Sequence, residues 1–301
     1  MNSEHLIEND LWVKEVSSKA VKQSIMNGQW SAIKTDWTMD RHRVKIPTIG
    51  WTRLKEFGYL PHDAKISSGT MSKQGDNYFV SVLCEVDEKS LTYQLSKVGI
   101  GLDLGVKDFA IASNGEIYKN INKEHRVKKY EKRLKREQRS LSRKYENKKR
   151  KRGESATQTG ANIRKNVLRV QKAHVKLANV RLEYIKKVAN ELVKTKPKYI
   201  TLEDLNVKGM LKNKHLSKSI AEQCFYTFNM YLKDKCKQYG IELREVDRWY
   251  PSSKICSSCG KLKADLKLSD RIYSYGCGVS LDRDFNASLN LKNALEYKIL
   301  T

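Results

Sequence analysis

The sequence contains no run of about 18 apolar residues, so it predicts no transmembrane helix. Its first residues, MNSEHLIENDLW, lack the basic stretch followed by an apolar stretch that marks a secretory signal. We therefore expect a cytoplasmic protein with no membrane partner. The 301 residues are enough for two or three domains, each with its own core.

Acidic residues are scarce relative to basic ones. The chain has 34 Asp and Glu against 59 Lys and Arg, which is a formal net charge of +25 at pH 7. A surplus this large opposes compaction and favours a polyanionic partner, of which nucleic acid is our first choice. The alternative is a soluble basic protein, such as one that associates with the ribosome. A nucleic-acid partner would place the protein at the nucleoid.

Cysteine is also scarce, and half of the six cysteines lie in the last fifth of the chain. Cys256 and Cys259 form a CxxCG knuckle, and Cys277 follows. In a reducing compartment this clustering indicates metal binding rather than disulfide bonds. A complete zinc ribbon needs four thiolates from two knuckles, but the first ligand position of the second knuckle is Ser274. The ribbon fold is therefore expected, while zinc binding stays open.

Other groups could complete such a zinc site at lower affinity. Asp265, Asp270 or a water molecule are the candidates, because no His lies nearby. Cys224 and Cys236 have no Cys or His neighbour in a ligand spacing, so we interpret them as thiols of the protein core.

The rest of the chain is organised around residues 98–118. Residues 98–104 form an apolar run interrupted only by glycines and Asp103, and a second short run over 108–113 leads into the turn signal Asn114–Gly115. A third strand is predicted to start at residues 116–118. An isolated Asp in a core strand is costly unless a partner compensates its charge, and a metal ion is the usual partner. The pattern therefore predicts a strand that presents Asp103 to a metal.

Two further carboxylates lie in settings that suit the same metal. Glu203 ends the predicted strand 199–203, and Asp284 lies in the motif DRDFN, at the start of a predicted helix. An ordinary helix N-cap is the alternative for the second motif, and by itself it would explain the residues. The hypothesis is that the three carboxylates converge.

Hydrophobic periodicity predicts the remaining elements. Residues 42–86 alternate in a way that indicates short strands, which we interpret as a small β-barrel or sheet, with or without a ligand. Helices are predicted over 13–33, 123–152, 163–193 and 216–239, with the last ended by Gly240, and a further strand over 241–246.

The predicted helix 123–152 is the most charged segment, with 16 Lys or Arg and 4 Glu. Tyr130, Leu134 and Leu141 form only a thin apolar stripe, so most of the helix surface is solvated. Because the cations greatly outnumber the anions, we favour contact with phosphates over a salt-bridged surface. The nucleic-acid-binding candidates are Lys128, Lys129, Lys132, Arg133, Arg136, Arg139 and Arg143.

Four motifs taken together resemble the TnpB (OrfB) family, which consists of transposon-encoded nucleases related to type V CRISPR effectors. In chain order they are GIGLDLGVKDFA, ITLEDLNV, WYPSSKICSSCG and DRDFNASLNLKN, and the resemblance covers roughly residues 13–294. It implies an α/β fold with a RuvC-like (RNase H-type) core that carries an inserted helical hairpin and a zinc-ribbon-like insert. A helix and a small β-barrel-like segment precede this core.

The resemblance also implies a site and a reaction. By motif, Asp103, Glu203 and Asp284 hold two Mg²⁺ ions, with Asp103 bridging both, and DNA phosphodiesters are hydrolysed. Two metals about 4 Å apart activate a water and stabilise the leaving oxygen, and Mg²⁺ prefers carboxylate ligands. The family further implies a guide RNA from the transposon end that pairs with the target DNA, while the protein reads a short flanking DNA motif.

Domain boundaries follow from the elements and the resemblance. We expect a residual helical segment over 1–40 and a β-rich wedge-like segment over 41–97. The RuvC-like core is expected in three parts, over 98–122, 197–250 and 281–301. A basic helical hairpin over 123–196 and the zinc-ribbon-like insert over 251–280 separate these parts.

The sequence departs from the family at two places. A first strand and an Asn-containing helix have no counterpart here, and Ser274 stands where the family has Cys, so we interpret the chain as a shortened copy. The first hypothesis is an active RNA-guided endonuclease, because three mutually repelling carboxylates bring no benefit to a protein that only binds. The shortening and Ser274 favour the second, a cleavage-deficient nucleic-acid-binding remnant. A strand-exchange transposase is a third interpretation.

Overall fold

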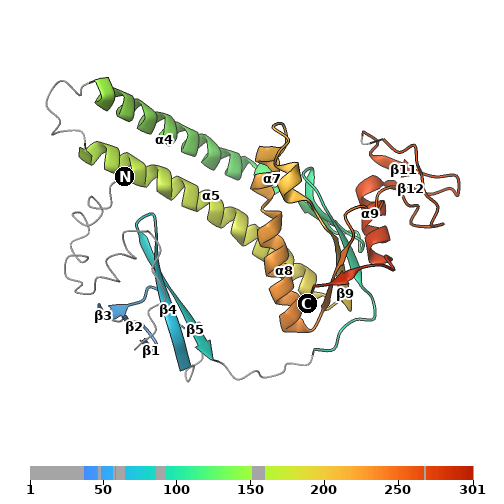
Figure 1. Cartoon of the computed structure of the whole chain (residues 1–301), viewed down its shortest axis with the longest axis horizontal. Helices are drawn as coiled ribbons and strands as arrows, with labels where there is room; N and C mark the ends of the chain where they lie inside the picture. The colour runs from blue at the N-terminus through green and yellow to red at the C-terminus, as the bar shows by residue number, and fades with distance from the viewer. Residues whose placement is uncertain are drawn as a thin grey trace. The chain divides into compact units, whose positions relative to one another are not determined.

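The computed structural model describes residues 37–46, 49–56, 58, 65–85, 93–150, 160–267 and 269–300. The predicted helix 13–33 lies outside these residues. The chain divides into two compact units, Met1–Ser90 with Arg139–Val175, and Leu91–Gln138 with Lys176–Thr301 (Figure 1). Helices α4 (His125–Arg150) and α5 (Gly160–Lys194) each contribute to both units.

The first unit contains two small antiparallel sheets. One has the strands β1 (Thr38–Asp40), β2 (Arg43–Ile46) and β3 (Gly50–Arg53), and the other is the hairpin of β4 (Lys65–Gln74) and β5 (Asn77–Glu85). Trp37, Val44, Ile46 and Met71 form their shared core. The predicted strands are confirmed, but β4 extends well beyond the predicted residues 65–66. Its sequence KISSGTMSKQ is largely polar, and the pairing with β5 sets its length.

The second unit is built on a six-stranded mixed sheet. Its strands are β6 (Ile100–Leu104), β7 (Asp108–Ala112), β8 (Ile117–Lys119), β9 (Tyr199–Glu203), β10 (Glu242–Val246) and β13 (Lys298–Ile299), in the spatial order β13-β10-β9-β6-β7-β8. The neighbours β6, β9 and β10 are parallel, and the other pairs are antiparallel. The sequence predicted every strand except the two-residue β13, which is too short to show a pattern.

Helices cover both faces of this sheet. Ile100, Leu102 and Leu104 on β6 pack on one face against apolar residues of α5, α7 (Ser217–Gln223) and α8 (Phe225–Tyr239). Side chains alternate along a strand, so Gly101 and Asp103 point to the opposite face. There α9 (Arg283–Lys292) crosses so closely that a Cβ on Gly101 would lie 2.0 Å from the Ser288 carbonyl oxygen. Glycine at position 101 therefore lets α9 lie directly on β6.

The predicted helix 216–239 is wrong in one respect, because it is two helices that meet at Cys224. This residue has φ 55° and ψ 39°, a left-handed conformation that is uncommon without glycine. Its thiol donates hydrogen bonds to the carbonyl oxygens of Ala221 (3.6 Å) and Glu222 (3.8 Å). The break redirects the chain so that Phe225 and Phe228 enter the core. As predicted, Cys236 is a buried core thiol, and Gly240 ends α8.

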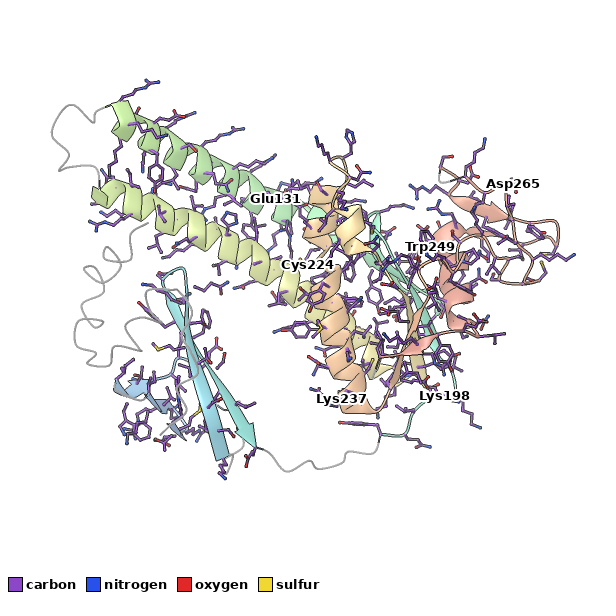
Figure 2. All side chains as sticks on the ribbon, in the orientation of Figure 1. Glu131, Lys198, Cys224, Lys237, Trp249 and Asp265 are labelled. Carbon is purple, nitrogen blue, oxygen red and sulfur yellow. The ribbon has the colours of Figure 1, made fainter. Side chains whose placement is uncertain are left out.

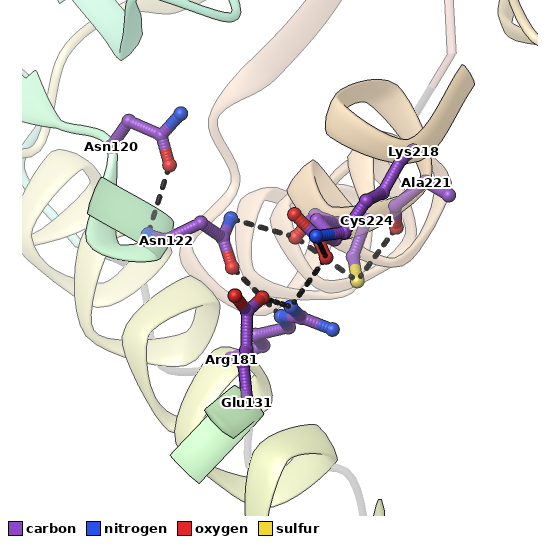
Figure 3. A network of polar contacts seen from close by, with 8 residues as sticks. Asn120, Asn122, Glu131, Arg181, Lys218, Ala221 and Cys224 are labelled. Atoms are coloured by element: carbon purple, nitrogen blue, oxygen red, sulfur yellow. Dashed lines mark hydrogen bonds and ion pairs between the residues drawn. The ribbon is translucent and has the colours of Figure 1, made fainter. Parts of the chain in front are cut away.

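A half-buried polar network holds the base of α4 and α5 against α7 (Figure 3). The Arg181 guanidinium donates to Asn122 Oδ1 at 2.8 Å and pairs with Glu131 at 3.2 Å and with Glu222 at 3.3 Å. Below it Val127, Leu177 and Val180 form a small core. Val127 lies on the same helix face as Tyr130 and Leu134, so it extends the predicted apolar stripe by one turn toward the start of α4.

The remaining elements form the insert before α9. Strands β11 (Ile272–Ser274) and β12 (Ser280–Asp282) pair as an antiparallel hairpin, with Ser274 opposite Ser280. This is the hairpin that a zinc-ribbon-like insert requires. In the part of the chain that is described, no helix is long and apolar enough to span a membrane.

Candidate functional site

The strand register brings Asp103 and Glu203 next to each other. Parallel pairing of β6 with β9 places Gly101 opposite Thr201, and two residues further on come Asp103 and Glu203. Both therefore lie on the α9 face, on neighbouring strands about 4.8 Å apart. The convergence follows from pairing between segments about 100 residues apart, which sequence periodicity cannot show.

Helix α9 brings Asp284 to the same place. Gly101 contacts α9 at Ser288, as described above. Asp103 lies two strand residues beyond Gly101, about 6.6 Å along β6, and Asp284 lies four helical residues before Ser288, about 6 Å along α9. The charge of Asp284 acts on Asp103, so the first turn of α9 lies near Asp103. Asp284 is about one-fifth exposed.

The electrostatics agree with this convergence. Burial raises the pKa of Asp103 well above its usual value, and the negative charges of Asp284 and Glu203 raise it further. Burial also raises the pKa of Glu203, while a hydrogen bond from the buried Ser252 opposes that shift. Cations brought to this face would relieve the repulsion.

The motif that contains Asp284 also supplies the helix cap. Asp282 is the N-cap residue, and its carboxylate accepts from the backbone N–H groups of Asp284 (3.0 Å) and Phe285 (3.2 Å). The Arg283 guanidinium lies 3.3 Å from the Asp284 carboxylate. The two interpretations of this motif therefore apply to different residues. Asp282 is the cap, and Asp284 is left to face Asp103.

The loop after β10 contributes groups that the sequence analysis did not identify. Val246 pairs with Glu203, and the Arg248 guanidinium lies 2.6 Å from Asp204, the residue after Glu203. Further along the loop, the Ser252 side chain hydrogen-bonds to the Glu203 carboxyl group. The motif WYPSSK contains Ser252, but only the folded chain shows which serine reaches the carboxylate.

A hollow of about 670 Å³ adjoins the carboxylates on the β7–β8 side of the sheet. Ile111 lies opposite Asp103 in the register of β6 and β7, and it lines this hollow with Phe285. Its rim carries three lysines, Lys107, Lys119 and Lys123, and three carboxylates, Asp108, Glu124 and Asp282. The Lys119 ammonium lies 3.3 Å from the Asp108 carboxylate. The hollow therefore combines an apolar floor with a rim that bears both signs of charge.

The oxygen donors on this face suit Mg²⁺, which prefers carboxylates and retains several waters. Across residues 37–300, leaving out the undescribed gaps, only Cys256, Cys259 and Cys277 place three potential ligand atoms within 4.8 Å of one another. The carboxylates thus do not form a ligand set for one ion.

The cysteine cluster suits a thiolate-binding metal but is incomplete. The Cys256 and Cys277 sulfur atoms are 3.4 Å apart, near the ~3.8 Å that tetrahedral Zn–S bonds of about 2.3 Å imply. Burial opposes ionisation of Cys256, but N–H groups of Cys259 and Ser258 donate to its sulfur and lower its pKa overall. The Ser274 hydroxyl lies 3.3 Å from that of Ser280. Neither Asp265 nor Asp270 belongs to the cluster, and Asp270 accepts from the Lys267 N–H instead.

The seven cationic candidates on α4 are all exposed, while Tyr130 and Leu134 of its apolar stripe pack against Leu177 and Val180. Glu131, an anion of the same helix, pairs with Arg181 and so does not neutralise them. They are available to phosphates, although nothing in the geometry selects a particular contact.

Two family models match the chain. Residues 81–214 match OrfB_IS605, described as "Probable transposase", and residues 225–291 match the "Cas12f1-like, TNB domain". Together they cover the β6–β9 region and the region from α8 to α9, and thus every carboxylate of the site.

Relatives of known sequence agree with these matches. A protein of Streptomyces pristinaespiralis named "Putative RNA-guided DNA endonuclease" is 31% identical over 88% of this chain and 58% of its own length. "Putative RNA-guided DNA endonuclease InsQ" of Escherichia coli strain K12 is 26% identical over 84% of this chain and 62% of its own length. The chain thus spans about three-fifths of these relatives.

The fold itself has a solved counterpart. The effector in the "Cas12f1-sgRNA-target DNA complex" superposes with a TM-score of 0.54 and 18% identity, over 99% of this chain and 52% of that chain. At this identity the match supports a shared mixed α/β fold. Together with the four motifs, the family models and the relatives show that the chain contains an OrfB_IS605 (TnpB) transposase region over residues 81–214 and a Cas12f1-like region over residues 225–291.

Proposed function

We propose that the chain is an RNA-guided DNA endonuclease with a RuvC-type site. The observation that carries this proposal is the meeting of Asp103, Glu203 and Asp284 on one face of the sheet. A buried carboxylate whose pKa is raised further by two neighbouring carboxylates is costly in a protein that only binds. Such carboxylates are useful where divalent cations must be held beside a phosphodiester.

The three carboxylates would hold two Mg²⁺ ions, with Asp103 on the central strand shared between them. When bound, such ions supply an activated water and stabilise the leaving oxygen. The other residues position the carboxylates and the nucleotide. Asp282 fixes the first turn of α9, Ser252 orients Glu203, and the hollow receives the nucleotide beside the phosphate that is cut.

RNA and DNA are the proposed partners. The relatives named as RNA-guided endonucleases and the fold shared with an effector bound to guide RNA and target DNA support this proposal. A guide from the transposon end would read the target by base pairing. The exposed cations of α4, beginning at Lys128 and Lys129, would contact the phosphates of RNA or of the heteroduplex.

We propose that Cys256, Cys259 and Cys277 bind a structural zinc ion. Three thiolates give lower affinity than four, because the fourth position would be taken by water or another weak ligand. The metal would link the CxxCG knuckle to the turn after β11.

One observation favours the second candidate function, a nucleic-acid-binding protein that does not cut. Ser274 occupies the place of a thiolate, and a loosened insert would shift the chain that enters α9 and carries Asp284. In that case the carboxylates would be present but misplaced.

A plasmid-cleavage assay distinguishes the two functions. The protein is purified with RNA from cells that carry the neighbouring transposon end, and is then given Mg²⁺ and a plasmid library of flanking motifs beside a matching target. Motif-dependent cutting by the native protein, absent in Asp103→Ala, establishes the nuclease. RNA binding without cutting supports the second function, and cutting by Asp103→Ala removes Asp103 from the site.

A further inference from the structure

Trp249 is the most exposed aromatic side chain in the described part of the chain. Its exposed fraction is 84%, and it lies on the loop that follows β10 (Figure 2). Large aromatic side chains are usually at least half buried, and exposed ones are typical of binding surfaces. The exposure of this indole therefore indicates that Trp249 contacts a ligand.

The loop that carries Trp249 is anchored on both sides. The Trp249 N–H donates to Asp247 Oδ1 at 2.8 Å, and the Tyr250 N–H donates to the Asp247 carbonyl oxygen at 3.0 Å. Tyr250 packs beside Val246 and Leu291, and its hydroxyl lies 3.3 Å from the Asn290 carbonyl oxygen. The backbone is held, so the exposure of the indole reflects its placement and not a loose loop.

The same loop begins and ends at Glu203. Val246 pairs with Glu203 in the sheet, and Ser252 hydrogen-bonds to the Glu203 carboxyl group. Trp249 stands midway, three residues from each, so its Cα lies within about 10 Å of both. The indole is thus presented at the edge of the carboxylate site.

The order of the strands places Trp249 across the site from the hollow beside the carboxylates. The hollow adjoins β7 and β8, the carboxylates lie on β6 and β9, and Trp249 follows β10. A chain molecule held in the hollow and at the carboxylates would continue toward Trp249. The net charge of +25 favours a nucleic acid over an apolar peptide as that molecule.

We propose that Trp249 stacks on an unpaired base of the DNA strand that passes the carboxylates. An indole can stack only on an open base face, and in a duplex those faces are covered by neighbouring bases. Trp249 therefore selects a single strand and holds it in place, as a positioning residue that touches no reacting atom. This inference rests on the proposed function for the identity of the strand.

The test measures binding without cutting. The full-length chain is titrated in EDTA with a fluorescein-labelled thymidine oligonucleotide and with a duplex of equal length. Because one stacked base contributes about 5- to 100-fold in affinity, Trp249→Leu should weaken single-strand binding by that factor, and Trp249→Phe by less. Duplex binding should not change. The matched control is Tyr226→Leu, which removes an aromatic of α8 that is 73% exposed and should have no effect.

Salt dependence separates stacking from charge. Trp249→Leu removes no phosphate contact, so the slope of log K against log salt should equal that of the native protein. A scan with single abasic sites in the oligonucleotide gives a measurement on the native protein alone. One position should weaken native binding as much as Trp249→Leu does, and should not weaken the binding of that variant further.

Several results would overturn the inference. The first is a Trp249→Leu variant that binds the single strand as tightly as the native protein does. The second is a loss of duplex affinity as large as the loss of single-strand affinity. The third is an abasic scan in which no position weakens native binding. If the native protein cuts plasmids while Trp249→Leu binds single strands normally, only this inference fails. If it does not cut but its single-strand binding depends on Trp249, the nuclease proposal fails and this inference stands.

Discussion

Replacing Asp103 by Asn should stabilise the metal-free protein at neutral pH. Asn has nearly the volume of Asp but no charge, so it keeps the packing and removes the repulsion. Burial, together with the charges of Asp284 and Glu203, raises the pKa of Asp103 well above 3.8. Its ionised form therefore destabilises the folded state, and the substitution removes that cost.

The size of the effect follows from the repulsion between neighbouring carboxylates. Asp284 and Glu203 both raise the pKa of Asp103. Two like charges about 5–6 Å apart repel by about 3 kcal/mol at an effective dielectric constant of ~20. Arg283 offsets part of this repulsion. A net gain of about 2 kcal/mol is expected, which raises the Tm of a unit of 150–250 residues by about 4–8 °C.

The pH dependence has a definite sign. Below the unfolded pKa of about 3.8 the carboxyl is protonated in both states and its charge costs nothing. Above the folded pKa, which is raised, the folded state bears the full cost. The stabilisation by Asp103→Asn should therefore grow as the pH rises from 3.8 to the raised folded pKa, and should vanish as the pH falls toward 3.8.

Thermal melting followed by circular dichroism checks this prediction. The native protein, Asp103→Asn and the matched control Asp265→Asn, an exposed Asp of the insert (Figure 2), are melted in EDTA between pH 4 and pH 8. Mg²⁺ should then raise the Tm of the native protein more than that of Asp103→Asn. A variant that melts at or below the native Tm at pH 7, or a difference that persists at pH 4, would refute the convergence of the carboxylates.

Three further predictions concern other parts of the chain. Ser274→Cys should raise bound zinc toward one per chain by elemental analysis, since it restores the fourth thiolate; equal zinc in both proteins would contradict this. Charge reversal at Arg133 and Arg136 should flatten the salt dependence of nucleic-acid binding by about one unit of slope per lost phosphate contact, and an unchanged slope would leave α4 without that role. Arg181→Met should destabilise the fold by about 1–3 kcal/mol, because it leaves Glu131 and Glu222 facing each other half-buried. Urea unfolding should show a larger loss at pH 7 than at pH 4, because burial and the charge of Glu222 raise the pKa of Glu131 and favour its protonated form at low pH; equal losses would mean that Arg181 acts through packing alone.

The sequence alone predicted the strands that carry Asp103 and Glu203 and the helix that begins near Asp284. Apolar runs and alternation report which local conformation buries the apolar side chains, and this information is carried by neighbouring residues. The CxxCG knuckle and the missing thiolate at Ser274 were also visible, because metal ligands must occur at set spacings. The four motifs in order were enough to identify the family.

Other features depended on contacts between distant segments. No glycine or proline marks the helix break at Cys224 in the sequence. The left-handed conformation of Cys224 is maintained because Phe225 and Phe228 pack into the core. Val127 became buried only when α5 packed against it.

The candidate site also combines features that the sequence determines with features that only the tertiary structure decides. The sequence determined which carboxylates are available, since each stands at the end or in the middle of an element with a clear local pattern. The tertiary structure decided that they meet, because the register of β6 with β9 and the close crossing of α9 over Gly101 join segments about 80 to 180 residues apart. It also decided that Ser252 reaches Glu203 and that Trp249 faces solvent. Local periodicity reports the face on which a side chain lies, and only long-range packing determines what that face meets.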